Sequence, residues 1–283
     1  MYKMIAIDLD GTLLNDEKEI SKEDIEWVNK AYNEKGVIPV ITTGRNVSSI
    51  EHFAHELGRD VVKYVISQNG AIIKNMVNDE YISQNMIPDE IVKKVIEIFK
   101  RYNISVTLET AMYVISDTKK SEEVMELYDK LGDEIRVIED LRSYDISNEQ
   151  ISIVTGEGEK GELENIIGEL EKLPEILVVP ISRYLAKNGD FVYERYYIEM
   201  TAKGVSKGAG ITKLANYLGI KNEEVMAIGD GENDIAMFEE GRLKIAMENS
   251  SQILKEKADY ITVTNNEAGV AKAIKKYIFD IQE

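Results

Sequence analysis

Two aspartates near the amino terminus have the type and spacing that metal and phosphate chemistry requires. Asp8 and Asp10 come directly after the apolar run 4–7, and Gly11 follows them. Side chains two residues apart on a strand point to the same side. Two ionised carboxylates 4 Å apart repel by about 4 kcal/mol at an effective dielectric near 20, and a bound cation or a retained proton relieves that repulsion. The stretch predicts a divalent metal site beside a glycine turn that offers N–H groups to an anion. A loop of solvated aspartates is the alternative.

Three later places carry small, polar or charged residues after an expected strand or at the start of an expected helix. Thr43 and Gly44 offer a hydroxyl and backbone N–H groups that suit a phosphate, although ordinary helix capping explains them as well. Lys207 stands at a helix start, where a cation is unfavourable unless it faces an anion; a solvated surface lysine is the alternative. Asp230 and Asp234 lie in an acidic, glycine-containing run that is either a ligand loop or a solvated one. Because ligands bind at the carboxyl ends of strands in open α/β sheets, these places together predict one site.

The helices and strands that must position these residues follow two different patterns along the chain. Strand and helix alternate in residues 1–83 and 200–283, with strands expected at 37–41, 63–66, 225–228, 243–246 and 260–262, and helices at 22–35, 47–57, 206–218 and 268–277. Residues 84–199 instead combine several short strands with helices at 88–101, from Ser121 to 131, and at 160–173. The pattern predicts an α/β core, 1–83 and 200–283, that is interrupted by an inserted α+β domain, 84–199.

Composition narrows the classes of protein and partner. The 283 residues are enough for two domains, and 43% of them are apolar, which supports a sizeable core. The net charge of −18 disfavours nucleic acid and anionic membranes as partners. The absence of cysteine excludes disulfides and thiolate metal sites. No signal-peptide layout and no membrane-spanning apolar run is present, so we expect a cytoplasmic protein.

These places resemble the motifs of a known family, the haloacid dehalogenase superfamily, and specifically its Cof-type subfamily IIB sugar phosphatases. The resemblance implies an α/β fold in which a Rossmann-like core with a mostly parallel sheet carries an inserted α+β cap domain of the C2B type. It extends over nearly the whole core, and only Ser250, where a small alanine is expected, departs mildly from the pattern. The matching stretches are Asp8-Leu9-Asp10-Gly11-Thr12, Thr43-Gly44-Arg45, Asn69-Gly70-Ala71, Lys207-Gly208, Gly229-Asp230-Gly231-Glu232-Asn233-Asp234, Ala246-Met247-Glu248-Asn249 and Glu267-Ala268-Gly269-Val270-Ala271.

The resemblance implies roles for the aspartates. Asp8 would attack phosphorus and form an aspartyl-phosphate. Asp10 would protonate the leaving oxygen and then deprotonate the water that hydrolyses the intermediate. Mg²⁺ would be the cofactor, bound by Asp8, by the backbone carbonyl of Asp10 and by Asp230, with waters completing its octahedron.

The resemblance also implies a cradle for the phosphoryl oxygens. Thr43, Gly44, Lys207 and Asn233 would hold these oxygens as charge spreads over them. Asp234 would orient Lys207 or a metal-bound water rather than bind the metal directly.

The function implied is that of a hydrolase, a Mg²⁺-dependent phosphatase acting on small phosphorylated metabolites, sugar phosphates foremost. A phosphomutase of the same superfamily is the alternative, and a phosphorylation-controlled receiver protein is a remote one. We expect a monomer or a weak homodimer with no nucleic-acid or membrane partner. The inserted residues 84–199 match no motif, so the physiological substrate stays open.

Overall fold

The computed structural model describes residues 1–117, 134–179, 182–188 and 191–281. The helix expected from Ser121 lies outside these described residues. The chain divides into two compact units: a core unit, formed by Met1–Arg45, Ile50–Gln84 and Ser206–Glu283, and an inserted unit, formed by Asn46–Ser49 and Asn85–Val205. The boundary predicted from the sequence, between residues 199 and 200, falls inside the strand Phe191–Ala202.

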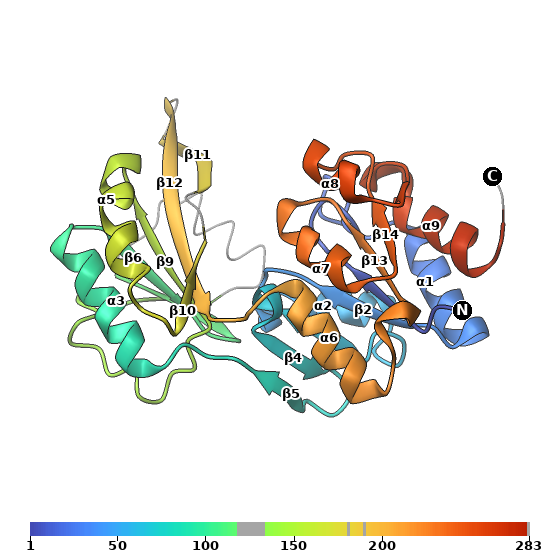
Figure 1. The fold of residues 1–283 in the computed structure, drawn as a ribbon, viewed down its shortest axis with the longest axis horizontal. Coiled ribbons are helices and arrows are strands. Elements are labelled where there is room, and N and C mark those ends of the chain that lie inside the picture. Colours follow the sequence, from blue (N-terminus) through green and yellow to red (C-terminus); the bar gives the residue numbers. More distant parts are fainter. Residues whose placement is uncertain (118–133, 180–181, 189–190, 282–283) are drawn as a thin grey trace. The chain divides into compact units, whose positions relative to one another are not determined.

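The core unit is built on an eight-stranded sheet in the order β15-β14-β13-β1-β2-β3-β4-β5 (Figure 1). Strands β15 to β3 run parallel, and β4 and β5 add an antiparallel edge. Because β1 pairs in parallel with both β13 and β2, the carboxyl ends of these three strands meet at one edge of the sheet. The strands are β1 (Met4–Ile7), β2 (Ile38–Thr42), β3 (Tyr64–Ser67), β4 (Ile72–Asn75), β5 (Tyr81–Gln84), β13 (Val225–Gly229), β14 (Leu243–Ala246) and β15 (Tyr260–Ile261).

Helices cover both faces of this sheet, as the buried, apolar strands require. Ile5 and Ile7 of β1 pack with α1, α2 and α9 on one face, whereas Met4 and Ala6 pack with α6, α7 and α8 on the other. The helices are α1 (Lys22–Lys35), α2 (Val47–Leu57), α6 (Lys207–Leu218), α7 (Ile235–Glu240), α8 (Gln252–Lys257) and α9 (Gly269–Ile278), with short 3₁₀ turns η1 (Gln68–Gly70), η2 (Asn222–Glu224), η3 (Glu232–Asp234) and η4 (Asn265–Glu267). The predicted alternation of strand and helix is confirmed.

The inserted unit is an α+β structure, as its denser strand pattern predicts. Its sheet has the order β10-β12-β9-β6-β7-β8, with β11 paired to β12, and only the β7–β8 pair is parallel. Helices α3 and α5 pack against each other beside this sheet (Figure 1), and Phe99 of α3 lies directly over Gly156 of β9. The elements are α3 (Asp89–Arg101), α5 (Lys160–Leu170), β6 (Ser105–Glu109), β7 (Tyr113–Ser116), β8 (Glu134–Val137), β9 (Ile153–Gly158), β10 (Ile176–Val178), β11 (Ser182–Asn188) and β12 (Phe191–Ala202). Within the described ranges, no helix is long and apolar enough to cross a bilayer.

Candidate active site

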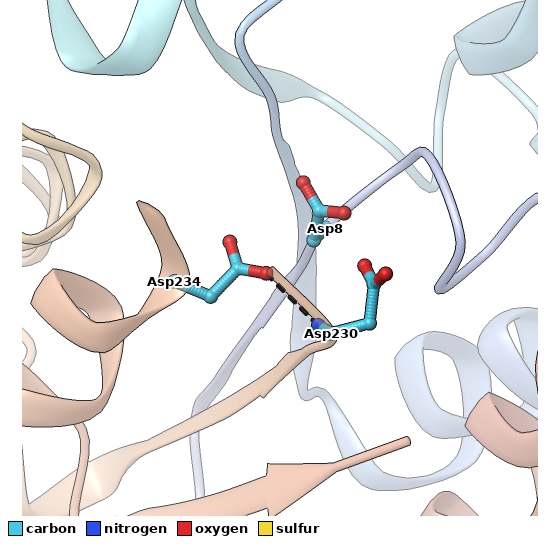
Figure 2. Close-up of side chains that lie close together, drawn as sticks. All are labelled: Asp8, Asp230 and Asp234. Atoms are coloured by element: carbon cyan, nitrogen blue, oxygen red, sulfur yellow. Dashed lines mark hydrogen bonds between the residues drawn. The ribbon is translucent and has the colours of Figure 1, made fainter. Parts of the chain in front are cut away.

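Three carboxylates from distant parts of the core unit meet at the carboxyl edge of its sheet. Asp8 follows β1, Asp230 follows β13, and Asp234 ends the turn η3. One carboxylate oxygen from each lies within 4.8 Å of the others (Figure 2). Asp8 and Asp234 are buried and Asp230 is half-buried. The predicted convergence of the amino-terminal aspartates with the late acidic loop is therefore present, and neither acidic stretch is a solvated loop.

Lys207 joins this cluster as its cation. Its ammonium donates to Asp8 Oδ1 at 2.5 Å and to Asp234 Oδ1 at 2.6 Å, and the residue is only 2% exposed. Ser206 places it at the start of α6, because the Ser206 hydroxyl accepts from the backbone N–H of Ala209. Lys207 is therefore not the surface lysine that the sequence left open.

A glycine lets the start of α6 approach η1 closely. Gly70 has φ +100°, and a Cβ at this position would lie 2.1 Å from the Ser206 carbonyl oxygen. Any other residue would be strained there and would push Ser206 away. The stretch Asn69-Gly70-Ala71 thus helps to place Lys207 beside the aspartates.

Burial and like charge set the protonation of the cluster. Burial raises the pKa of Asp8, Asp234 raises it further, and Lys207 only partly offsets both. Burial and then Asp234 likewise raise the pKa of Asp230. Burial alone would lower the pKa of Lys207, but Asp8 and Asp234 outweigh it, so that pKa is raised and the amine stays charged. Three carboxylates facing one ammonium leave surplus negative charge, and this all-oxygen donor set fits a hard divalent cation such as Mg²⁺.

The hydrogen bonds of Asp234 distinguish it from the other two acids. Its Oδ1 accepts from Lys207, and its Oδ2 accepts from the backbone N–H groups of Asp230 and Gly231, both at 2.9 Å. Both oxygens are thus engaged in shaping the loop and holding the lysine. This arrangement agrees with the expectation that Asp234 orients Lys207, and it leaves Asp8 and Asp230 as the carboxylates with capacity for a metal.

Asp10 lies apart from this cluster, in an ion pair. Arg45 donates to its two oxygens at 2.6 and 2.7 Å, and Lys18 donates to Oδ1 at 3.0 Å. Burial would raise the pKa of Asp10, but the hydrogen bonds and charges of Arg45 and Lys18 outweigh it, so the pKa is lowered. The metal role expected for Asp10 concerns its backbone carbonyl and stays a prediction.

Sequence reasoning gave no role to Arg45 or Lys18. Arg45 was within reach, because it is the third residue of the matched stretch Thr43-Gly44-Arg45. Lys18 lies in a polar loop eight residues beyond Asp10, and no spacing rule marks it. Its contact with Asp10 depends on how the loop folds back.

The expected phosphate residues line a cavity of about 330 Å³ together with the acids. This cavity is lined by Asp8, Asp10, Thr43, Gly44, Arg45, Lys207, Asp230, Gly231 and Asn233. The backbone N–H of Thr43 donates to the Ile66 carbonyl at 2.8 Å, so of the groups that Thr43 was expected to offer, this N–H is already engaged. The Asn233 amide donates to Asn69 Oδ1 at 3.4 Å, and Asn69 is a further neighbour that the sequence left without a role.

The turn after Asp10 packs directly on Asp230. Gly11 has φ +76°, and a Cβ there would lie 2.4 Å from Asp230 Oδ2. Thr12 donates its hydroxyl to Asp230 Oδ1 at 3.0 Å. Glycine is required at position 11 for both reasons, its backbone conformation and the closeness of the carboxylate.

Comparison with known proteins agrees with this geometry. The sequence matches the family of haloacid dehalogenase-like hydrolases over residues 5–274. The chain belongs to this family. Like its relatives it is an enzyme of the phosphatase type, acting on phosphorylated small molecules.

Relatives with curated names and solved structures align along nearly the whole chain. A 5-amino-6-(5-phospho-D-ribitylamino)uracil phosphatase of Bacillus subtilis, YcsE, is 32% identical over 276 residues, covering 98% of this chain and 96% of that protein. A haloacid dehalogenase-like hydrolase from Bacteroides thetaiotaomicron superposes with a TM-score of 0.80 at 29% identity, over 98% of this chain and 99% of that one. The subclass IIB sugar phosphatase BT4131 gives a TM-score of 0.76 at 26% identity, over 99% and 100%. The Rossmann-like core with an inserted domain is therefore confirmed.

Proposed function

We propose that this protein is a Mg²⁺-dependent phosphatase that hydrolyses small phosphorylated metabolites, sugar phosphates foremost, through an aspartyl-phosphate. The observation that carries the proposal is the buried cluster of three carboxylates and one ammonium at the wall of a small polar cavity. A surplus of buried negative charge is costly without a cation. Relatives named for a ribityl phosphate and for sugar phosphates support this substrate class.

Asp8 acts as the nucleophile in this proposal. One of its carboxylate oxygens attacks phosphorus, and the bond between phosphorus and the ester oxygen breaks. The leaving oxygen takes a proton from Asp10. Water then attacks the phosphorus of the aspartyl-phosphate, Asp10 accepts the proton of that water, and phosphate leaves with the Asp8 carboxylate restored.

The contacts of Asp10 suit the second of these steps. Arg45 and Lys18 hold Asp10 as a carboxylate and fix its direction. That form accepts a proton from water. For the first step Asp10 must carry a proton, which requires the contact with Arg45 to loosen when an anionic substrate enters the same cavity.

Mg²⁺ would be held by the carboxylates of Asp8 and Asp230 and by the backbone carbonyl of Asp10. When bound, the ion supplies positive charge that offsets the carboxylates and the phosphoryl oxygens. Thr12 holds Asp230 in place through its hydroxyl. These are oxygen ligands throughout, as Mg²⁺ prefers.

The phosphoryl group would be held by Lys207, by the Thr43 hydroxyl, by the Gly44 N–H and by the Asn233 amide. All four residues line the cavity that also contains Asp8. Lys207 is already fixed by Asp8 and Asp234, so it needs little reorganisation when charge develops on the phosphoryl oxygens.

The remaining parts of the proposal concern the inserted unit and the setting of the enzyme. We propose that the inserted unit is a cap that selects the organic part of the substrate. We also propose a cytoplasmic enzyme, a monomer or a weak homodimer, without nucleic-acid or membrane partners. The net charge of −18 supports the last point.

The test is a screen of phosphorylated metabolites with the wild-type enzyme and the Asp8→Asn variant, in Mg²⁺ and in EDTA. We expect Mg²⁺-dependent release of free phosphate and a loss of at least about a thousandfold in kcat for Asp8→Asn, with the fold retained by circular dichroism. Asp60→Asn, an exposed aspartate of the same unit, is the control and should keep full activity. Near-normal hydrolysis by Asp8→Asn would exclude Asp8 as nucleophile, and conversion of a hexose 1-phosphate to an isomeric ester would indicate a phosphomutase.

A further inference from the structure

The loop after β14, residues 247–251, contacts both of the loops that carry the aspartates of the site. On one side the backbone N–H of Met247 donates to the Gly229 carbonyl, and that of Ser251 donates to the Asp230 carbonyl, each at 3.1 Å. On the other side the amide of Asn249 donates to the Gly11 carbonyl at 2.7 Å. The loop therefore connects the turn after Asp10 with the loop that begins at Asp230.

Asn249 is bonded to a peptide group, Gly11–Thr12, that lies next to the acidic cluster. A peptide group is planar, so fixing the Gly11 carbonyl also fixes the N–H of Thr12. The Thr12 hydroxyl donates to Asp230 Oδ1, and Gly11 itself lies against the same carboxylate. Asn249 does not line the cavity with the acids. The Gly11–Thr12 peptide lies between Asn249 and Asp230.

A second asparagine orients the first. The backbone N–H of Asn265 donates to Asn249 Oδ1 at 3.1 Å, so the NH₂ group of Asn249 is the end that faces Gly11. The Asn265 side chain, only 4% exposed, donates to the Leu14 carbonyl at 2.9 Å. The turn after Asp10 is thus held at its beginning by Asn249 and at its end by Asn265.

We infer that Asn249 is a positioning residue that sets the separation between Asp8 and Asp230 through the Gly11–Thr12 peptide. Asn265 fixes the orientation of the Asn249 amide. The inference rests on the proposed function and adds a residue outside the acidic cluster to it. Two carboxylates bind one small ion tightly only when their oxygens are held at a fixed spacing. Losing Asn249 loosens that spacing while every residue of the acidic cluster remains.

Two substitutions at position 249 separate positioning from general stability. Asn249→Ala removes both of its hydrogen bonds. Asn249→Asp keeps an oxygen that accepts from Asn265 but removes the donor to Gly11. Asn249 is exposed, so neither change disturbs the core. Asn266→Ala is the matched control, because Asn266 is a nearby asparagine whose amide is hydrogen-bonded to Asp16 rather than to Gly11 or Asn265.

The measurements are Mg²⁺ binding by calorimetry, thermal unfolding in EDTA, and steady-state kinetics with the best substrate of the screen. We expect both position-249 variants to bind Mg²⁺ about tenfold more weakly and to lose about tenfold in kcat, with KM within twofold. Their unfolding temperatures in EDTA should match that of Asn266→Ala, which should bind Mg²⁺ like the wild type.

Two results would overturn the inference. One is wild-type Mg²⁺ affinity and kcat in Asn249→Ala. The other is full retention of both by Asn249→Asp, which would show that the donor to Gly11 has no role. If the wild-type protein neither binds Mg²⁺ nor releases phosphate, the proposed function itself is wrong. The wild-type measurements alone show this, so that outcome is distinct from a failure of the inference about Asn249.

Discussion

The core unit and the inserted unit each pair a lysine with a buried aspartate, but the balance of charge differs. In the core unit Lys207 faces three carboxylates, those of Asp8, Asp230 and Asp234. In the inserted unit Lys100 pairs with Asp117, whose side chain is 1% exposed. The first group retains surplus negative charge when every member is ionised, whereas Lys100 and Asp117 contribute one charge of each sign.

The neighbours of the two groups show what this difference means. Asp117 Oδ1 also accepts the backbone N–H of Val106 at 3.0 Å, so the pair ties the last turn of α3 to the neighbouring strands. That is a structural contact with its charges matched. The core cluster stays unbalanced, and an unbalanced buried cluster is explained by something that binds to it. In this protein the balance of charge thus separates the acidic cluster from the Lys100–Asp117 ion pair.

The largest expected effect is that of Lys207→Ala in the core cluster. The change leaves two buried carboxylates and the half-buried Asp230 without their cation, and breaking such a pair typically costs about 3–5 kcal/mol. Urea unfolding in EDTA should show this loss in the free energy of unfolding. Mg²⁺ should restore part of it, because a divalent ion then replaces the missing charge. A loss below about 1 kcal/mol would mean that the cluster is not strained by its charge.

Another buried acid, Asp24, sharpens the comparison, because its carboxylate is hydrogen-bonded to neutral groups. Its carboxylate accepts from the Ser21 hydroxyl and from the Ala271 N–H, each at 2.7 Å, and burial raises its pKa to about 6. Between the unfolded pKa, about 3.9, and this value, the folded protein holds the proton more tightly. The free energy of unfolding should therefore fall as pH rises through this window, by up to about 3 kcal/mol from Asp24.

Asparagine does not titrate, so the Asp24→Asn variant should lose the part of the pH dependence of the unfolding free energy that comes from Asp24. The measurement is urea unfolding at several pH values from 4 to 7, in EDTA, with the exposed Asp60→Asn as a control that should keep the wild-type slope. Identical slopes for Asp24→Asn and the wild type would show that Asp24 is ionised throughout the window.

The smallest expected effect is that of Lys100→Ala in the inserted unit. The loss should be about 1–3 kcal/mol, because Lys100 is partly exposed, at 23% for its side chain, and Asp117 keeps the Val106 N–H. Mg²⁺ should restore none of it, in contrast to Lys207→Ala. Urea unfolding with and without Mg²⁺ measures both variants, and equal recovery in both would remove the distinction drawn between the two groups.

Much of the fold follows from local patterns. Ser21 and Gly36 mark the ends of α1, and the structure has this helix at Lys22–Lys35. The return of strand–helix alternation after residue 205 correctly predicted that both ends of the chain share one sheet. Capping and periodicity work within a few residues, so a sequence displays them directly.

Contacts between distant residues were harder to foresee. Lys207 and Asp8 are 199 residues apart, and only their place at the ends of neighbouring parallel strands and helices suggested that they meet. Arg45 and Asn249 lie in stretches that match the family, but nothing in the sequence indicated that they contact Asp10 and Gly11, and nothing marked Lys18. Each depends on how a loop folds back on the sheet edge, which no short-range spacing encodes.

The sequence by itself determined the kinds of chemistry available, because the residue types and the strand order place aspartates, a threonine–glycine pair and a lysine at one sheet edge. Only the tertiary structure decided which acid faces which cation. Lys207 holds Asp8 and Asp234, while Arg45 holds Asp10. The physical reason is that hydrogen bonds and ion pairs depend on distances of a few tenths of an ångström, and these are fixed by packing across the whole core unit.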